Sequence, residues 1–271
     1  MSSWMLLRGL TRESGHWGRF PDQLRMRLPG AQVIALDLPG NGALHRAHSP
    51  ASVAAMVEAA RRQLADQGVA PPYHLLALSL GAMVALDWAV RRPQELAGCV
   101  LLNTSLARLS PFYRRLRPAN YAALAGLLAG RGGDAVREST ILRLTSARPE
   151  AHAAVAAEWA AIREARPVTP GNALRQLLAA LRYRAPHQAP PVPTLVLAGA
   201  GDRLVDPRCS QALAGAWGWP IALHRWAGHD LALDDGPWVA EQVARWLAGP
   251  RAADCGNASP APTGLSESAA G

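Results

Sequence analysis

A serine between an apolar stretch and a helical pattern is the strongest candidate nucleophile in the sequence. Ser79 lies in the run ALSLG at positions 77–81. A serine on a tight strand-to-helix turn presents its hydroxyl above the edge of a sheet, and small residues two places before and after it let the turn pack closely. Such a hydroxyl could attack a carbonyl carbon. The structural alternative is that Ser79 only caps the helix that follows.

A serine nucleophile needs a base, and the base needs a group that orients it. His229 follows an apolar run in the sequence GHD at 228–230, and Asp202 follows another in GAGDRLV at 199–205. The chain order Ser, Asp, His is the one used by serine hydrolases built on a parallel α/β sheet. The structural alternative is that His229 is a histidine in a surface loop without a catalytic role.

Other acidic and basic side chains compete for these roles. The competing aspartates are Asp206, Asp230, Asp234 and Asp235. Asp230 is adjacent to His229 and is expected to point away from it, and the other three are expected to cap the helices that follow them. The remaining histidines lack such a context, although His16 could face the pocket.

Six apolar runs that end in small or turn-forming residues predict buried parallel strands. They span 4–7, 33–38, 73–78, 99–102, 194–198 and 221–226. Helical patterns alternate with them near 16–28, 52–67, 80–91, 207–217 and 237–248. The alternation predicts an α/β fold with a mostly parallel sheet of about six strands and flanking helices. Ligands of such folds bind at the carboxyl ends of the strands, where all three candidate residues lie.

The stretch 105–190 has no strand pattern and divides into helical patterns near 118–130, 134–146, 149–165 and 171–184. We interpret it as a helical cap inserted between two parts of an α/β core, 1–104 and 191–248. Residues 249–271 are rich in Gly, Ala, Ser and Pro, which predicts a disordered tail.

The charge of the 271-residue chain is unevenly distributed. It has 28 basic and 20 acidic residues, and every basic one is arginine. The absence of lysine excludes a pyridoxal phosphate Schiff base, a Walker-type phosphate loop and a Ser-x-x-Lys site. The net charge of +8 lies within 104–190. Those arginines either form a solvated face or form a positive rim that attracts an anionic substrate or an acidic carrier protein.

Several other classes of protein are disfavoured by the sequence. No nucleic-acid recognition motif is present despite the basic charge. The scattered Cys99, Cys209 and Cys255 indicate neither a disulfide framework nor a metal site. The apolar run near the N-terminus is too short for a signal peptide or a membrane span. We therefore expect a cytoplasmic protein without a cofactor.

These motifs together resemble the α/β-hydrolase superfamily over about residues 4–248, and most closely its capped serine esterases. That group includes carboxylesterases and pimeloyl-carrier-protein methyl ester esterases. The run RGL at 8–10 matches the oxyanion loop, and DLPGNG at 37–42 matches a conserved turn of the superfamily. The resemblance implies a catalytic triad of Ser79, Asp202 and His229. It also implies an oxyanion hole made by the backbone N–H groups of Leu10 and Leu80.

The chain departs from the superfamily pattern at the oxyanion loop and at one edge. Arg8 stands where a histidine is usual, which is expected to place a fixed positive charge near the pocket. The first two strands of the full fold are expected to be missing. Some relatives carry the triad acid after the fourth strand, where this chain has Asn103. Substrate contacts are expected from a set near the loop and the acid: Arg8, Gly9, Trp17 and Val205.

The resemblance favours hydrolysis of small carboxylic esters through an acyl-enzyme. One alternative is a thioesterase or ester hydrolase that acts on acyl-coenzyme A or an acyl-carrier protein. Another is a non-catalytic binding protein with the same fold. Dehalogenases and epoxide hydrolases are excluded because they need an aspartate at position 79. A cofactor-free oxygenase or a carbon–carbon hydrolase stays open, since both can keep the serine and the histidine.

Overall fold

The sheet has six parallel strands. The computed structural model describes residues 2–130 and 132–249. The strands are β1 (Ser3–Leu7), β2 (Gln32–Leu36), β3 (Tyr73–Leu78), β4 (Leu96–Leu102), β5 (Thr194–Gly199) and β6 (Ile221–His224). They are ordered β2-β1-β3-β4-β5-β6, and each pair is parallel. This arrangement confirms the predicted α/β-hydrolase fold.

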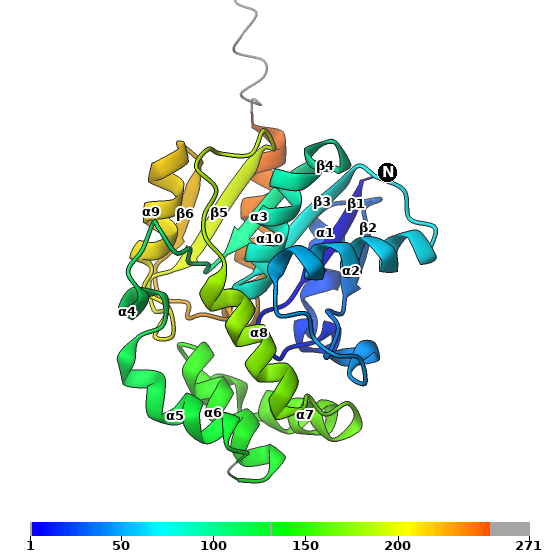
Figure 1. The fold of residues 1–271 in the computed structure, drawn as a ribbon. Helices are drawn as coiled ribbons and strands as arrows, with labels where there is room; N and C mark the ends of the chain where they lie inside the picture. The colour runs from blue at the N-terminus through cyan, green and yellow to red at the C-terminus, as the bar shows by residue number, and fades with distance from the viewer. Residues whose placement is uncertain (1, 131, 250–271) are drawn as a thin grey trace, which may run out of the picture.

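Helices cover both faces of the sheet, which explains why the central strands are continuously apolar. One face packs against α2 (Val53–Asp66), α3 (Leu80–Arg91) and α9 (Arg208–Trp217). The other packs against α1 (Phe20–Arg27) and α10 (Leu231–Ala248). Successive side chains of a strand point to opposite faces, so a strand buried on both sides needs apolar residues at every position. Figure 1 shows the layers.

The segment between β4 and β5 is helical. It contains α4 (Phe112–Arg115), α5 (Tyr121–Leu128), α6 (Asp134–Thr145), α7 (Ala153–Ala165) and α8 (Pro170–Arg182). We call this group of helices the cap. In Figure 1 helices α5 to α8 gather beyond the carboxyl ends of the strands. The single turn α4 was not anticipated from the sequence, because four residues are too few for a periodic pattern.

Two predicted helices have different limits in the structure. The one predicted at 16–28 is a short 3₁₀ turn, Ser14–Trp17, followed by α1, and Gly18 between them has a φ of +50°. The one predicted at 237–248 begins at Leu231, but its helical backbone is interrupted at Asp235 ahead of Pro237. Proline cannot donate a helical hydrogen bond, and the Asp235 carboxylate accepts one from the Trp238 N–H instead.

Other sequence expectations concern the membrane and the end of the chain. Of the described helices, none has the length and apolarity needed to cross a bilayer. The predicted disordered tail, apart from its first residue, lies outside the described residues.

Candidate active site

Ser79 occupies the tight turn between β3 and α3. Its backbone has φ +57° and ψ −114°, a left-handed conformation that is uncommon for a residue with a side chain. The turn is held by backbone hydrogen bonds. The Ser79 N–H donates to the Leu102 carbonyl at 3.0 Å, and the Thr104 hydroxyl donates to the Ser79 carbonyl at 3.2 Å. The strained backbone aims the hydroxyl away from the helix and toward the cavity described below.

Two glycines let the predicted oxyanion loop approach Ser79. A β-carbon at Gly81 would lie 2.5 Å from the Leu7 carbonyl oxygen, so only glycine fits there without a shift of the backbone. A β-carbon at Gly9 would lie 3.3 Å from the β-carbon of Ser79. The segment after β1 therefore runs directly beside the nucleophile turn. Leu10 and Leu80 line the same cavity as Ser79. An oxyanion hole made by their backbone N–H groups would lie in this cavity.

His229 is buried and is paired with Asp202. The Nδ1 atom of His229 lies 2.8 Å from an Asp202 carboxylate oxygen, and both residues are nearly inaccessible to solvent. The second Asp202 oxygen accepts hydrogen bonds from the N–H groups of Leu204 and Val205 at 2.8 and 2.9 Å. A carboxylate at Nδ1 keeps the proton on that nitrogen and leaves Nε2 free to act as a base.

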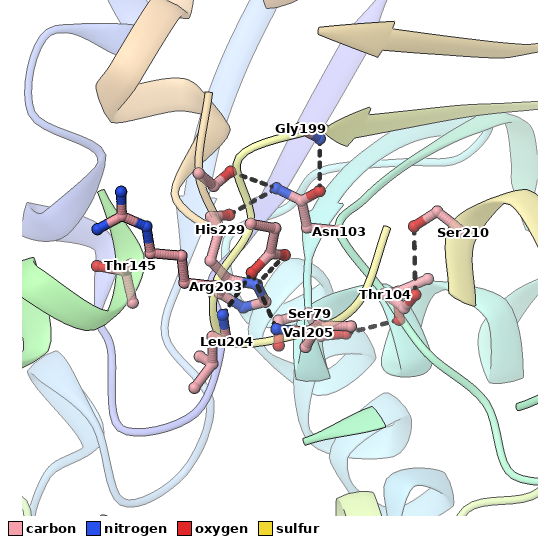
Figure 2. A network of polar contacts seen from close by, with 12 residues as sticks. Ser79, Asn103, Thr104, Thr145, Gly199, Arg203, Leu204, Val205, Ser210 and His229 are labelled. Carbon is pink, nitrogen blue, oxygen red and sulfur yellow. Dashed lines mark hydrogen bonds and ion pairs between the residues drawn. The ribbon is translucent and has the colours of Figure 1, made fainter. Parts of the chain in front are cut away.

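Asn103 ties together the segments that carry the acid and the base. Its amide nitrogen donates to the carbonyls of Gly228 and His229 at 2.9 and 2.8 Å, and its oxygen accepts from the Gly199 N–H at 2.9 Å. Figure 2 shows Asn103 between these two segments. An aspartate there could not donate to the two carbonyls. The position that holds the acid in some relatives thus serves to position the histidine loop here.

The positive charge expected from Arg8 is neutralised. Its guanidinium makes two hydrogen bonds, of 3.0 and 2.5 Å, with the carboxylate of Asp230. Burial raises the pKa of Asp230, but Arg8, with smaller contributions from Arg12 and His229, holds that pKa below its usual value. This bidentate pair joins the oxyanion loop to the residue after His229. Sequence reasoning missed it because the partners are 222 positions apart.

The prediction that Trp17 contacts the substrate is wrong. It is buried in the core on the α1 and α10 face, where its ring packs with Phe20, and it is not among the residues that line the cavity. The Arg8 guanidinium lies 4.8 Å from the centre of the indole ring. Trp17 therefore packs against the Arg8 guanidinium from the core. His16 is also buried, and burial lowers its pKa well below the usual range.

A cavity of about 410 Å³ lies between the sheet edge and the cap. Ser79 and His229 line it together with Arg8, Gly9 and Val205. The rest of the lining is mainly apolar side chains of the cap and the core. Apolar walls around a few convergent polar groups are typical of small-molecule sites. The segments that follow β1, β3, β5 and β6 thus all contribute predicted site residues to one cavity.

The competing acids have structural partners. Asp206 was expected to cap α9; its carboxylate accepts a hydrogen bond from the N–H of the first helical residue, Arg208, at 3.0 Å, while Pro207 occupies the N-cap position. Asp234 was expected to cap a helix, but its carboxylate accepts from the N–H groups of Gly228 and Ala147 and from the Ser146 hydroxyl. It therefore attaches the cap to the loop before His229. In the described ranges no three His, Cys, Asp or Glu side chains gather as a metal site would require.

A buried ionic network also joins the cap to the core. Glu138 on α6 is fully buried and pairs with Arg12 of the core at 2.6 Å and with Arg163 of α7 at 2.5 Å. Arg12 also lies 4.0 Å above the Trp159 ring. Burial lowers the pKa of Arg12 to about 10, although Glu138 opposes this shift. Arg12 therefore remains charged at neutral pH and depends on its carboxylate partner.

The substitution Glu138→Gln is expected to destabilise the protein by about 3–5 kcal/mol, because it leaves two buried guanidinium groups without a counter-charge. Urea unfolding measures this change. The matched control is Glu164→Gln, an exposed carboxylate on α7, which should change the free energy of unfolding by less than about 0.5 kcal/mol. Equal effects of the two substitutions would show that the network does not hold the cap.

Comparisons with known proteins agree with this architecture. The family model for serine aminopeptidase, S33, matches residues 4–229. The structure is similar to a thermophilic esterase from Thermogutta terrifontis, with 20% identity over 92% of this chain and 90% of that chain and a TM-score of 0.71. It is also similar to an esterase from a Rhodococcus species, with 22% identity over 91% of this chain and 90% of that chain and a TM-score of 0.69.

An enol-lactonase from Burkholderia xenovorans is 16% identical over 92% of each chain, with a TM-score of 0.73. No curated protein matches the sequence. At such low identities the similarity to solved structures supports the shared fold, and the family rests on the match of the family model.

Proposed function

Because this chain belongs to the serine aminopeptidase S33 family of α/β hydrolases, we propose that it cleaves carboxylic esters with an apolar acyl chain, using Ser79, His229 and Asp202. One observation carries the proposal. A serine on a strained turn lines the same apolar cavity as a histidine whose Nδ1 is paired with a buried aspartate. That combination supplies an activatable nucleophile beside a place for an acyl chain.

In the proposed reaction, the Ser79 hydroxyl oxygen attacks the ester carbonyl carbon while Nε2 of His229 takes the hydroxyl proton. The carbonyl oxygen becomes an oxyanion that the backbone N–H groups of Leu10 and Leu80 would bind, each contributing about 3–4 kcal/mol to the transition state. His229 then returns the proton to the departing alcohol. A water molecule activated by His229 releases the acid from the acyl-enzyme. Asp202 stabilises the imidazolium in both steps.

The charge of the cavity favours an ester over a peptide with a free amino terminus. An aminopeptidase needs an unpaired carboxylate to receive the substrate ammonium group. The lining carboxylate among the described residues is Asp230, and Arg8 already occupies both of its oxygens. The other charged groups on the lining are arginines and His229.

The acyl chain preference tests the proposed function. With p-nitrophenyl esters from acetate to decanoate, we expect kcat/KM to rise by up to about fourfold per methylene until the cavity is full, since each buried methylene contributes about 0.8 kcal/mol. Leu124→Trp, on the lining part of α5, should lower the longest chain accepted. Leu174→Trp, at a half-exposed position on α8 outside the lining, is the control. A flat profile would contradict an apolar acyl pocket.

A thioesterase acting on acyl-coenzyme A or an acyl-carrier protein is the second candidate. The arginine excess of residues 104–190 favours it, because both carriers are anionic. Acyl-thioesters added to the same panel distinguish the two candidates. Turnover of a carrier-linked substrate should fall as salt rises, and a rate independent of ionic strength would rule out attraction by the cap.

A further inference from the structure

Two arginines on the cavity lining lack a carboxylate partner in the described part of the chain. They are Arg115 on α4 and Arg137 on α6. Arg115 donates from one terminal nitrogen to the Ala180 carbonyl of α8 at 2.8 Å, and Arg137 donates to the Leu127 carbonyl of α5 at 3.1 Å. The Nε atom of each is buried without a hydrogen-bond partner. Each guanidinium therefore keeps unused donors in a largely apolar space.

The other lining arginines differ from this pair. Arg8 is matched by Asp230, and Arg12 and Arg163 share Glu138. Burial lowers the pKa of Arg115, and the nearby Cys209 opposes this shift. A positive charge in a low-dielectric site is stabilised by an anion that enters with it. The lining thus has excess positive charge on the cap side of the cavity.

We propose that the positive charge of Arg115 and Arg137 on the cap side of the cavity selects an ester substrate that carries an anionic group, carboxylate or phosphate, at the other end of an apolar chain from the ester. A guanidinium group matches both anions. In each of the two arginines one terminal nitrogen makes no hydrogen bond with the described residues, and it would donate to the anion. This inference rests on the proposed ester hydrolysis and specifies its substrate class. The apolar wall would hold the chain, and the two arginines would select against neutral esters.

A matched pair of esters tests this selection. Methyl octanoate and monomethyl suberate have the same chain length and differ by a terminal carboxylate. We expect the ratio of kcat/KM, charged over neutral ester, to fall by about tenfold to a hundredfold in Arg115→Gln and Arg137→Gln, the range expected for a lost charged hydrogen bond. Arg115→Lys should recover part of the ratio. Arg143→Gln, an exposed arginine of α6, should keep it.

Binding measured by calorimetry separates this inference from the proposed hydrolysis. Suberate and hexyl phosphate should bind the full-length protein more tightly than 1-octanol, a neutral compound with an apolar chain of similar length, and Arg115→Gln should remove the difference. The stronger of the two anions identifies the carboxylate or the phosphate source. Tight anion binding without turnover of either ester would refute the proposed hydrolysis alone. Equal binding of all three compounds, or equal losses with both esters, would show that the arginines only hold α8 and α5 in place.

Discussion

If Ser79 is the nucleophile, its replacement by alanine is expected to lower kcat for ester hydrolysis by about 10⁵–10⁶-fold, as loss of the nucleophile does in a serine protease. The fold should persist, because the hydrogen bonds made by Ser79 within the turn are those of its backbone. A p-nitrophenyl ester of medium chain length measures the activity, and thermal melting checks the fold.

A fluorophosphonate probe supplies the control for this prediction. It should label the wild-type protein at Ser79, located by peptide mapping, and should not label Ser79→Ala. Ser105 is the matched control, since it is a buried serine that lines the same cavity. Ser105→Ala should still be labelled. Absence of any adduct in folded wild-type protein would instead indicate a binding protein that shares this fold.

Replacement of Asp202 by asparagine is expected to lower kcat by about 10⁴-fold, as the equivalent change does in a serine protease. The asparagine oxygen could still accept from the Leu204 and Val205 N–H groups, so the loop should keep its shape. Its amide nitrogen would face Nδ1 of His229 as a donor. That contact favours the tautomer with the proton on Nε2, which cannot take the proton from Ser79.

Asp206→Asn is the control for Asp202→Asn, because it removes another buried carboxylate from the same loop. Asp206 pairs with Arg208, which helps to lower its pKa to about 2, and it has no contact with the histidine in the structure. Its replacement should change kcat by less than about tenfold if only the triad acid orients His229. A larger loss of kcat from Asp206→Asn than from Asp202→Asn would show that Asp206, and not Asp202, is the acid of the triad.

The positions of the candidate triad could be predicted because each residue follows a strand of one parallel sheet. A run of apolar residues identifies a buried strand from its neighbours in the chain alone. Parallel strands end at a common edge, so the residues after them are brought together without knowledge of any distant contact. The structure accordingly places Ser79 and His229 on one cavity and pairs His229 with Asp202.

The role of Asn103 shows where such reasoning stops. Its place after β4 identified it as the site of the acid in some relatives. Its three hydrogen bonds to Gly199, Gly228 and His229 depend on how two later segments fold back over β4. The sequence shows that a polar residue follows the strand, but it does not show which groups that residue contacts.

The sequence by itself determined the parallel sheet, the helical character of the cap and the turn that carries Ser79, because these depend on patterns within a few residues of the chain. It also established that the excess charge lies within 104–190. Only the tertiary structure decided which arginines of the cavity lining have a carboxylate partner. Arg8 and Arg12 meet carboxylates 222 and 126 positions away, whereas Arg115 and Arg137 line the cavity without a carboxylate partner among the described residues. Ion pairs between distant segments form only when the folded chain brings those segments together.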